Sequence, residues 1–323
     1  MTTTYVGIDV AKATLQVHLQ GHQFEFPNHA KGHAKLAKKL AQLPQPHVIC
    51  EATGGYERPI VAVLHQDQIP VSVLNPAHTL AATKAQGQRA KSDPGDAAAL
   101  TDYGQRYQPA PTLAVPPERR DLTALALWLQ QLIDQRAVAK TQAEHHDHAF
   151  VRRQHAQLLS HYDEQIKTVE AEIKQQVQAQ PEFQQRLDCL VEIPGVGFRT
   201  ALMMLVLMPE LGQLNRRTAA ALAGLAPWTR DSGTMKGQRR IGGGRAQVRP
   251  VLYMSALSAS RCNPVLAPFY QALKKRNKLS KVALTAVMRK LVVYMNHKLK
   301  VLATTPPVQK TKTATKSKKV LAN

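Results

Sequence analysis

Short stretches near the N-terminus alternate apolar and polar residues with the period of two that indicates β-strands. Residues 5–10 (Tyr-Val-Gly-Ile-Asp-Val), 14–19 and 23–26 follow this pattern, and only a few polar residues separate them. The spacing predicts three strands joined by tight turns in an antiparallel meander.

The chain then alternates helical and strand patterns as far as about residue 107. The pattern predicts a helix around 36–43, a strand at 47–50, a helix around 60–64, a strand at 71–74 and an alanine-rich helix ending near 107. Three strands followed by helix, strand, helix, strand and helix is the order of the ribonuclease H-like α/β fold. We therefore predict one such domain over residues 1–108.

Prolines between residues 109 and 117 interrupt this pattern and predict a linker. From Glu118 to about Val177 the chain has almost no glycine or proline, and apolar residues recur at helical spacing. This predicts two long helices over 109–182, a coiled-coil segment of the kind that usually serves dimerisation. A mainly α C-terminal domain is predicted over 183–303, and a basic, disordered tail over 304–323.

The net charge of +21 on 323 residues suggests a polyanionic partner, and its distribution says where that partner binds. Residues 216–300 contain 18 Lys or Arg and a single acid, Asp231, so the basic excess lies in the C-terminal third. Three widely spaced cysteines indicate neither a disulfide framework nor a zinc cluster. With no signal peptide and no apolar run of transmembrane length, we expect a cytoplasmic, nucleoid-associated prokaryotic protein without membrane contact.

Four carboxylates lie on the predicted strands and helix of the first domain. Asp9 lies within the first strand, Glu51 ends the fourth, and Asp93 and Asp96 begin the last helix. Each has an ordinary structural explanation: an edge or turn position for Asp9, and helix capping for the other three. Together, however, they can converge at one end of the sheet and hold Mg²⁺ or Mn²⁺ for phosphoryl transfer.

Two glycine-containing segments of the C-terminal domain are candidates for phosphate contacts. Residues 193–197 (Ile-Pro-Gly-Val-Gly) fit a helix-hairpin-helix turn, in which Gly195 and Gly197 admit a DNA phosphate to backbone amides, or they simply join two helices. Residues 225–245 form a loop rich in glycine and arginine. Its candidate nucleic-acid-binding side chains are Arg230, Lys236, Arg239, Arg240 and Arg245.

Ser232 lies within this basic loop. An isolated serine of this kind usually belongs to a turn, but neighbouring cations would favour its alkoxide and a pentavalent phosphate. There is no histidine nearby in the sequence, so a general base would have to come from elsewhere.

Taken in order, these motifs resemble the DEDD insertion-sequence transposases, which are related to Piv-type DNA invertases and described as bridge-RNA-guided recombinases. The resemblance rests on Gly7-Ile8-Asp9, Cys50-Glu51-Ala52-Thr53-Gly54, Asn75-Pro76, Asp93-Pro94-Gly95-Asp96-Ala97, Ile193-Pro194-Gly195-Val196-Gly197, Leu222-Ala223-Gly224-Leu225, Ser232-Gly233 and Arg249-Pro250-Val251-Leu252-Tyr253. Two features depart from the family pattern: Pro250, where an arginine or another helix former is expected, and the three consecutive glycines 242–244.

The resemblance implies a RuvC-like domain in which Asp9, Glu51, Asp93 and Asp96 bind metal, and a C-terminal transposase domain in which Ser232 is catalytic. It further implies a covalent phosphoserine link to DNA and a structured guide RNA that pairs with donor and target DNA. A homo-oligomer, dimer to tetramer, would combine the acids of one subunit with the serine of another.

Three alternatives remain from the sequence. A RuvC-like metal-dependent junction nuclease would use the carboxylates with water as nucleophile. A non-enzymatic helix-hairpin-helix DNA-binding protein would use only the turn and the basic third. A sugar-kinase or actin-like ATPase also opens on a Gly-Ile-Asp strand, but the glycine-rich phosphate loops expected after that strand are absent.

Overall fold

The computed structural model describes residues 3–85, 93–228, 237 and 239–304, with residues 93, 94 and 117 described by their backbone alone. It divides into two compact units, Met1–Val115 and Pro116–Asn323. Within the described ranges, no helix combines the length and apolar character needed to cross a membrane. The predicted tail beyond Thr304 lies outside the described residues.

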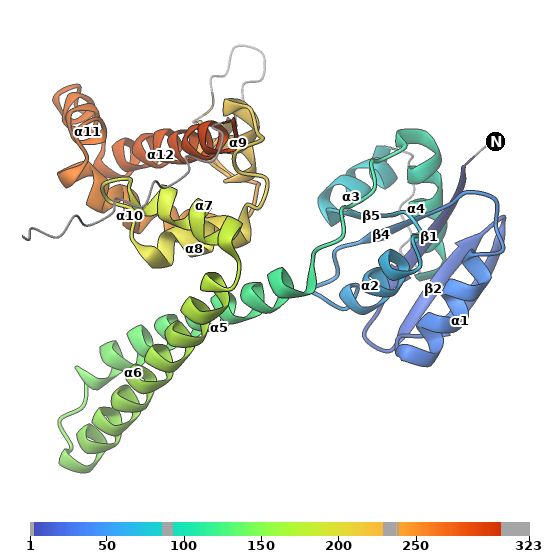
Figure 1. Ribbon diagram of the computed structural model, residues 1–323, viewed down its shortest axis with the longest axis horizontal. Helices are drawn as coiled ribbons and strands as arrows, with labels where there is room; N and C mark the ends of the chain where they lie inside the picture. The colour runs from blue at the N-terminus through green and yellow to red at the C-terminus, as the bar shows by residue number, and fades with distance from the viewer. Residues whose placement is uncertain (1–2, 86–92, 229–236, 238, 305–323) are drawn as a thin grey trace, which may run out of the picture. The chain divides into compact units, whose positions relative to one another are not determined.

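The first unit contains a five-stranded sheet with the strand order β3-β2-β1-β4-β5 (Figure 1). The strands are β1 (Thr4–Val10), β2 (Thr14–Leu19), β3 (His22–Pro27), β4 (Pro46–Glu51) and β5 (Val71–Leu74). β2 pairs antiparallel with both β1 and β3, which confirms the predicted meander. β4 pairs parallel with both β1 and β5. The carboxyl ends of β1, β4 and β5 therefore meet at one edge of the sheet.

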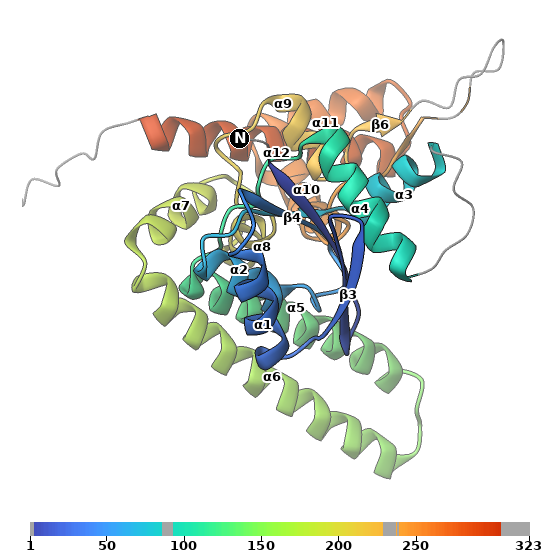
Figure 2. The same cartoon turned by 90° about the vertical axis from the view of Figure 1, so that its right-hand side faces the viewer.

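Helices cover both faces of this sheet (Figure 2). They are α1 (Ala30–Leu40), α2 (Arg58–Gln66), α3 (Pro76–Ala85) and α4 (Asp93–Tyr107). Apolar residues of α1 and α2 share a core with Val6, Ile8 and Val10 of β1, while α4 lies against the other face. α4 begins at Asp93, as the predicted helix start there requires, and Pro94 is in its first turn, where its missing N–H costs nothing. The alanine-rich stretch before it, which the sequence left undivided, contains α3 as a separate helix.

The proline-containing segment 108–116 has neither helix nor strand, as predicted for a linker. Thr112, in the middle of this segment, nevertheless binds the edge of β5. The amide of Thr112 donates to the Val71 carbonyl over 2.8 Å, and the Thr112 hydroxyl accepts from the amide of Val73 over 2.9 Å. Because these residues extend the first unit, the division falls at residue 115 rather than at 108.

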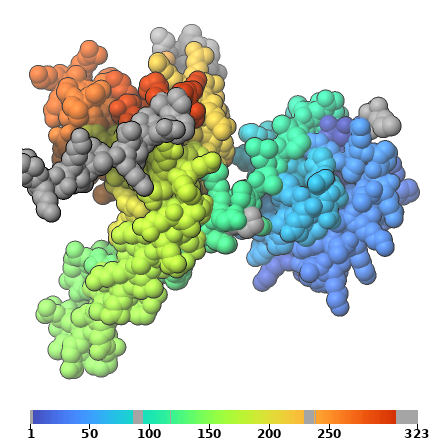
Figure 3. Space-filling model, in the orientation of Figure 1, coloured from blue at the N-terminus to red at the C-terminus, as the bar shows by residue number. Residues whose placement is uncertain are grey.

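The second unit begins with two long helices, α5 (Pro117–Ala143) and α6 (Ala149–Gln178), in the region where the sequence predicts them. They form a hairpin that stands out from the rest of the second unit (Figure 3). Arg136 of α5 binds Asp163 of α6 through both carboxylate oxygens, at 2.7 and 3.2 Å.

The remaining elements of the second unit are mainly helical. They are α7 (Pro181–Val191), α8 (Phe198–Leu207), α9 (Arg216–Leu222), β6 (Pro227–Trp228), β7 (Arg240–Ile241), α10 (Val248–Cys262), α11 (Leu266–Lys275) and α12 (Ser280–Thr304). One continuous core joins the hairpin to these helices, from Leu122 to Leu299. For this reason the predicted boundary at 182/183 does not separate two packed bodies.

Candidate active site and nucleic-acid interface

Asp9 and Glu51 lie side by side at the carboxyl edge of the sheet. The register pairs Ile8 of β1 with Cys50 of β4, so Asp9 and Glu51 are the next positions along two parallel strands. Ile8 and Cys50 are buried in the core that α1 and α2 share. Because side chains alternate along a strand, Asp9 and Glu51 point to the opposite face, which α4 covers, and both are half-buried.

Two close approaches fix how α4 crosses this face. A Cβ on Gly7 would lie 2.0 Å from the carbonyl oxygen of Ala97, and one on Gly104 would lie 2.7 Å from the Tyr5 ring. The later part of α4 therefore lies over the start of β1 and its earlier part over the middle of that strand. The first turn of α4 thus lies toward the end of β1 that carries Asp9.

That first turn contains the other two predicted acids. Asp93 is the first residue of α4, and its side chain lies outside the described part of the structure. Asp96 is half-buried and immediately precedes Ala97, the residue that approaches Gly7. Among the described residues, no three His, Cys, Asp or Glu side chains lie close enough to hold a metal ion. The fold thus brings Asp9, Glu51 and the start of α4 to one edge without closing a metal cage from described side chains.

A threonine that the sequence did not single out holds Glu51. The buried hydroxyl of Thr79, one turn into α3, donates to Oε1 of Glu51 and also lies 3.0 Å from the Pro76 carbonyl. β5 ends at Leu74, opposite Glu51 in the register, so the start of α3 lies beside the carboxylate. A helix that begins directly after a parallel strand is the only sequence signal for this contact.

The loop after Glu51 is shaped by a second, buried glutamate. Oε2 of Glu57 accepts hydrogen bonds from the amides of Thr53 (3.0 Å) and Gly55 (2.9 Å). Gly54 and Gly55 have φ of 63° and 105°, in the left-handed region that favours glycine. Glu57 therefore stabilises the turn.

Cys50 is next to Glu51 but is not a competing nucleophile. Burial, together with the nearby carboxylates of Glu57 and Glu51, raises the pKa of the Cys50 thiol to about 12. A thiol with such a pKa stays protonated at neutral pH and reacts slowly.

The two glycines of the predicted helix-hairpin-helix turn have different surroundings. Gly195 has φ of 95°, and a Cβ there would lie 2.6 Å from the backbone of Ala259 in α10. Asn263 donates to the carbonyl of Pro194 over 3.0 Å and so ties the turn to the end of α10. Gly197, the N-cap of α8, has open space around its Cβ position, and no side chain caps the helix. Gly195 therefore serves internal packing, and Gly197 is the one open to a ligand.

Ser232 belongs to the segment that joins β6 to β7. These short strands pair antiparallel, with Trp228 opposite Arg240. Ser232, Arg230 and Lys236 lie outside the described residues. At the end of this segment Arg239 and Arg240 are both exposed.

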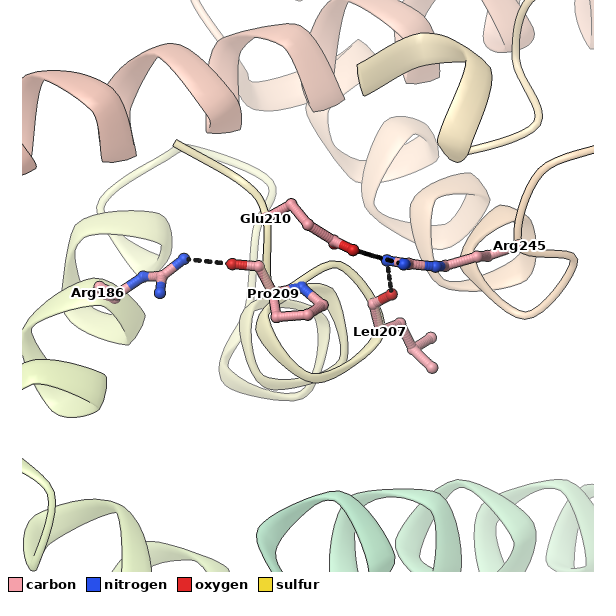
Figure 4. Close-up of polar contacts among 5 residues, drawn as sticks. All are labelled: Arg186, Leu207, Pro209, Glu210 and Arg245. Carbon is pink, nitrogen blue, oxygen red and sulfur yellow. Dashed lines mark hydrogen bonds and ion pairs between the residues drawn. The ribbon is translucent and has the colours of Figure 1, made fainter. Parts of the chain in front are cut away.

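Arg245 is engaged within the domain (Figure 4). Its guanidinium binds both carboxylate oxygens of Glu210, at 2.6 and 2.8 Å, and donates to the carbonyl of Leu207 over 2.7 Å. From the other side, Arg186 donates to the carbonyls of Pro209 (3.2 Å) and Leu211 (2.9 Å). Arg245 therefore holds the turn after α8.

Electrostatics agree with this pairing. Burial raises the pKa of Glu210, but hydrogen bonds from Arg245 and the backbone, together with the charges of Arg245 and Arg119, outweigh burial. The pKa of Glu210 therefore lies below its ordinary value.

Of the three glycines 242–244, a departure from the family pattern, Gly244 has a packing explanation, Gly243 has a positive φ of 66°, and Gly242 has open space around its Cβ position. A Cβ on Gly244 would lie 2.4 Å from the amide of Gly224, so the ribbon of β6 and β7 packs directly on the end of α9. The second departure, Pro250, lies in the first turn of α10, where a backbone N–H has no helical partner. Neither departure requires a contact to nucleic acid.

A groove of about 410 Å³ lies beside β7. Its walls include Ile241, Arg249, Tyr253 and Lys281, so apolar and basic groups line it together. This is the part of the second unit in which the basic excess of the sequence is found.

Comparisons with known proteins agree on one group. Residues 6–146 match a family model described as a transposase and named for the insertion sequence IS110. Residues 187–271 match a second model, described as the IS116/IS110/IS902 transposase family.

Individual relatives extend this result over nearly the whole chain. The pilin gene-inverting protein of Moraxella lacunata is 29% identical over 307 residues, covering 90% of this chain and 94% of that protein. The protein of the same name from Moraxella bovis matches to the same extent. An uncharacterized 43.6 kDa protein of insertion element IS110 from Streptomyces coelicolor is 32% identical over 141 residues, which cover 42% of this chain and 33% of that protein. The chain therefore matches, in this order, the two transposase domain models of the IS110/IS116 group, and over nearly its whole length it is similar to the pilin gene-inverting proteins.

Proposed function

We propose that the protein cuts and rejoins donor and target DNA of an insertion sequence, with Ser232 as the nucleophile and a RuvC-like carboxylate centre as its partner. The observation that carries this proposal is the convergence of Asp9, Glu51 and the first turn of α4 at one edge of the sheet. The order of elements and the parallel pairing of β1, β4 and β5 support a ribonuclease H-like fold. The relatives named for gene inversion support cutting and rejoining, because inverting a DNA segment requires both.

The donor set at this edge fits Mg²⁺ or Mn²⁺, because hard divalent cations prefer carboxylate oxygens. Asp9, Glu51, Asp93 and Asp96 would hold the cation, which when bound supplies positive charge to the phosphate under attack. Thr79 keeps one oxygen of Glu51 occupied by a hydrogen bond and leaves the second for another partner. The half-buried positions of Asp9 and Glu51 limit the water around them and strengthen their interaction with a cation.

The proposed reaction is a pair of transesterifications. Oγ of Ser232 loses its proton and bonds to phosphorus, while the bond from phosphorus to the leaving strand oxygen breaks and that oxygen takes a proton. A hydroxyl of a new strand then attacks the phosphoserine, restoring the diester and the serine. Because the ester keeps the energy of the first bond, rejoining needs no external energy source.

The basic C-terminal third is the proposed surface for DNA and for a structured guide RNA that pairs with donor and target. Arg239, Arg240 and the open Gly197 are the described candidates for phosphate contacts. The charge of residues 216–300 favours any polyanion, and the guide itself is proposed from the resemblance alone.

We further propose a homo-oligomer, dimer to tetramer, in which the α5/α6 hairpin contributes to self-association. Val138, Phe150 and Leu158 of the hairpin are 57%, 56% and 41% exposed. Exposed apolar side chains of this kind are typical of a surface that another protein covers.

A metal-dependent junction nuclease is the second candidate, since it would use the same carboxylates with water. Incubation with DNA and Mg²⁺ separates the two. We expect a covalent protein–DNA adduct that survives denaturation and maps to Ser232 by protease digestion. Ser232→Ala should lose the adduct but still bind DNA, and Asp9→Asn should lose it through the metal site. Cleaved DNA with no adduct, at an undiminished rate in Ser232→Ala, would favour the nuclease.

A further inference from the structure

Trp228 is a large aromatic side chain left exposed on the most basic part of the protein. It is 64% exposed in the second unit, although burying an indole is strongly favourable. It ends β6, and Ser232 follows it by four positions in the sequence. Four residues of chain span at most about 14 Å, so the tryptophan marks the surroundings of the proposed nucleophile.

The exposed ring is held in place. Nε1 of Trp228 donates to the carbonyl of Gly242 over 3.1 Å. A Cβ on Gly243 would lie 3.5 Å from Cζ2 of the ring, so the backbone there approaches the same edge of the indole. One edge is fixed on the ribbon while the rest of the ring is open. A fixed ring loses little conformational freedom when a flat partner stacks on it.

The charge around the ring selects the partner. Arg240 lies directly opposite Trp228 in the antiparallel pair, and residues directly opposite project from the same face of such a ribbon. Arg239 and Arg240 are exposed, and residues 216–300 hold 18 Lys or Arg against one acid. An aromatic ring beside arginines is the arrangement with which proteins bind single-stranded nucleic acid, stacking on bases and pairing with phosphates.

We propose that Trp228 is a stacking platform for an unpaired nucleobase, with Arg240 on the adjoining phosphate. The inference rests on the proposed function in assuming a nucleic-acid substrate, and it adds that the strand beside Ser232 is unpaired at this position. In that case the protein binds single strands or locally opened duplex here more tightly than closed duplex.

The chain offers a direct optical test, because Trp128 and Trp228 are its two tryptophans. In a Trp128→Phe background, the fluorescence of Trp228 should be quenched when a single-stranded DNA or RNA oligonucleotide binds. An oligomer of abasic residues with the same phosphates should bind by charge and leave the fluorescence nearly unchanged. Closed duplex, whose bases are already stacked, should quench less than the single strand.

Affinity gives the second measurement, made on the full chain at fixed salt. Trp228→Ala should weaken binding of the single strand by roughly 5- to 150-fold, the range for losing one base–aromatic stack, and should barely change binding of the abasic oligomer. Trp228→Phe is the matched control, since it also loses the hydrogen bond to Gly242 but keeps a ring. It should retain most of the affinity, so a merely structural role of Nε1 would make both variants equally weak.

The outcomes separate this inference from the proposed function. Binding of nucleic acid with no quenching and an unchanged affinity in Trp228→Ala would overturn the stacking platform and leave the recombinase proposal intact. Equal losses for the base-containing and abasic oligomers would also overturn it, because the defect would then lie in the ribbon. No binding of any oligonucleotide by the wild-type chain would contradict the proposed function itself.

Discussion

The amide of Gly7 in β1 donates a hydrogen bond to the hydroxyl of Thr101 in α4 over 2.9 Å. Nδ1 of His18 in β2 lies 2.9 Å from the same hydroxyl. The buried Thr101 thus joins two strands to the helix whose first turn carries Asp96. The distance between Asp9 and that turn depends on this junction, which is why Gly7 belongs to the candidate site although it has no side chain.

Gly7→Ala should therefore destabilise the first unit and impair the site. The new Cβ would lie 2.0 Å from the carbonyl oxygen of Ala97, a backbone atom that can move only with the helix. We expect a loss of about 1–3 kcal/mol or more in the free energy of unfolding. Thermal melting of the full chain measures the loss.

Thr101 supplies the matched controls for this junction. Thr101→Ser keeps the hydroxyl and should stay close to wild type, whereas Thr101→Val leaves the Gly7 amide without its acceptor and should cost about 1–3 kcal/mol. A melting curve of Gly7→Ala that superimposes on wild type would mean that α4 does not lie on β1 in this way.

The glycines of the turn between α7 and α8 should respond differently. Gly195→Ala combines a positive φ with a Cβ 2.6 Å from Ala259, so we expect a large fall in melting temperature. Gly197→Ala meets open space at negative φ and should lower the melting temperature much less, by no more than alanine's weaker N-capping costs. If a phosphate approaches Gly197, this second variant will weaken DNA binding in a protein that is still folded. Unchanged affinity would leave the turn a structural connection only.

The pairing of Glu210 with Arg245 predicts an acid-sensitive contribution to stability. The pKa of Glu210 is depressed in the folded protein, so this contribution is present above its ordinary value of 4.5 and is lost as the pH falls through the lower, folded value. Since both side chains are more than a third exposed, the pair contributes about 1 kcal/mol or less. Glu210→Gln should be less stable than wild type at pH 7, and the difference should shrink by pH 3.

Melting curves at pH 7, 5, 4 and 3 measure this difference. Glu172→Gln is the control, because Glu172 is an exposed glutamate that accepts from a neutral partner, Gln176. It should leave the pH dependence of melting as it is in wild type. A constant gap between wild type and Glu210→Gln across the whole range would show that Arg245 does not favour the charged form of Glu210.

The period-two and helical patterns of the first unit predicted its strands and helices because local alternation decides which face is buried. They also placed Asp9 and Glu51 together, since parallel neighbours end at one edge. That α3 and α4 are two helices was missed because alanine-rich sequence favours helix throughout. Asp93 and Pro94 were interpreted as a helix start, but nothing before them indicated that a separate helix had ended.

Contacts between distant side chains that no strand pairing brings together could not be predicted. Arg245 and Glu210 are 35 positions apart, and an arginine in a basic, glycine-rich loop gives no sign of a carboxylate partner elsewhere. Gly195 and Gly197 look alike in sequence, and only the position of α10 distinguishes them. Thr79 was missed for the same reason, because its role depends on which strand ends beside it.

Replacing Arg239 and Arg240 with alanine should reduce the salt dependence of DNA binding. Both are exposed, and each phosphate that an arginine neutralises contributes about one unit to the slope of log affinity against log salt. Arg152 and Arg153, two adjacent exposed arginines of α6, form the matched pair outside the basic third. The double alanine variant at 239 and 240 should have a flatter slope, and the one at 152 and 153 should not. Equal slopes in wild type and in both double variants would mean that Arg239 and Arg240 do not contact DNA phosphates.

In the proposed oligomer, the acids and the serine of one site come from different subunits. A mixture of Ser232→Ala and Asp9→Asn proteins should then recombine DNA although neither does so alone. In a mixed assembly some sites would combine the intact acids of the serine variant with the intact serine of the acid variant.

The amount of restored activity should follow from how the sites are shared. For a dimer with sites shared between subunits and random mixing at equal amounts, half of the assemblies are mixed, and each contains one fully intact site and one doubly defective site. Strand cleavage, which needs one site, should then return to about a quarter of the wild-type level. Complete recombination, which needs cuts on several strands, should return less. Tagging the two variants differently shows which one carries the adduct, and it should be the Asp9→Asn chain. If the mixture stays inactive while the tags confirm mixed assemblies, each site is built within a single subunit.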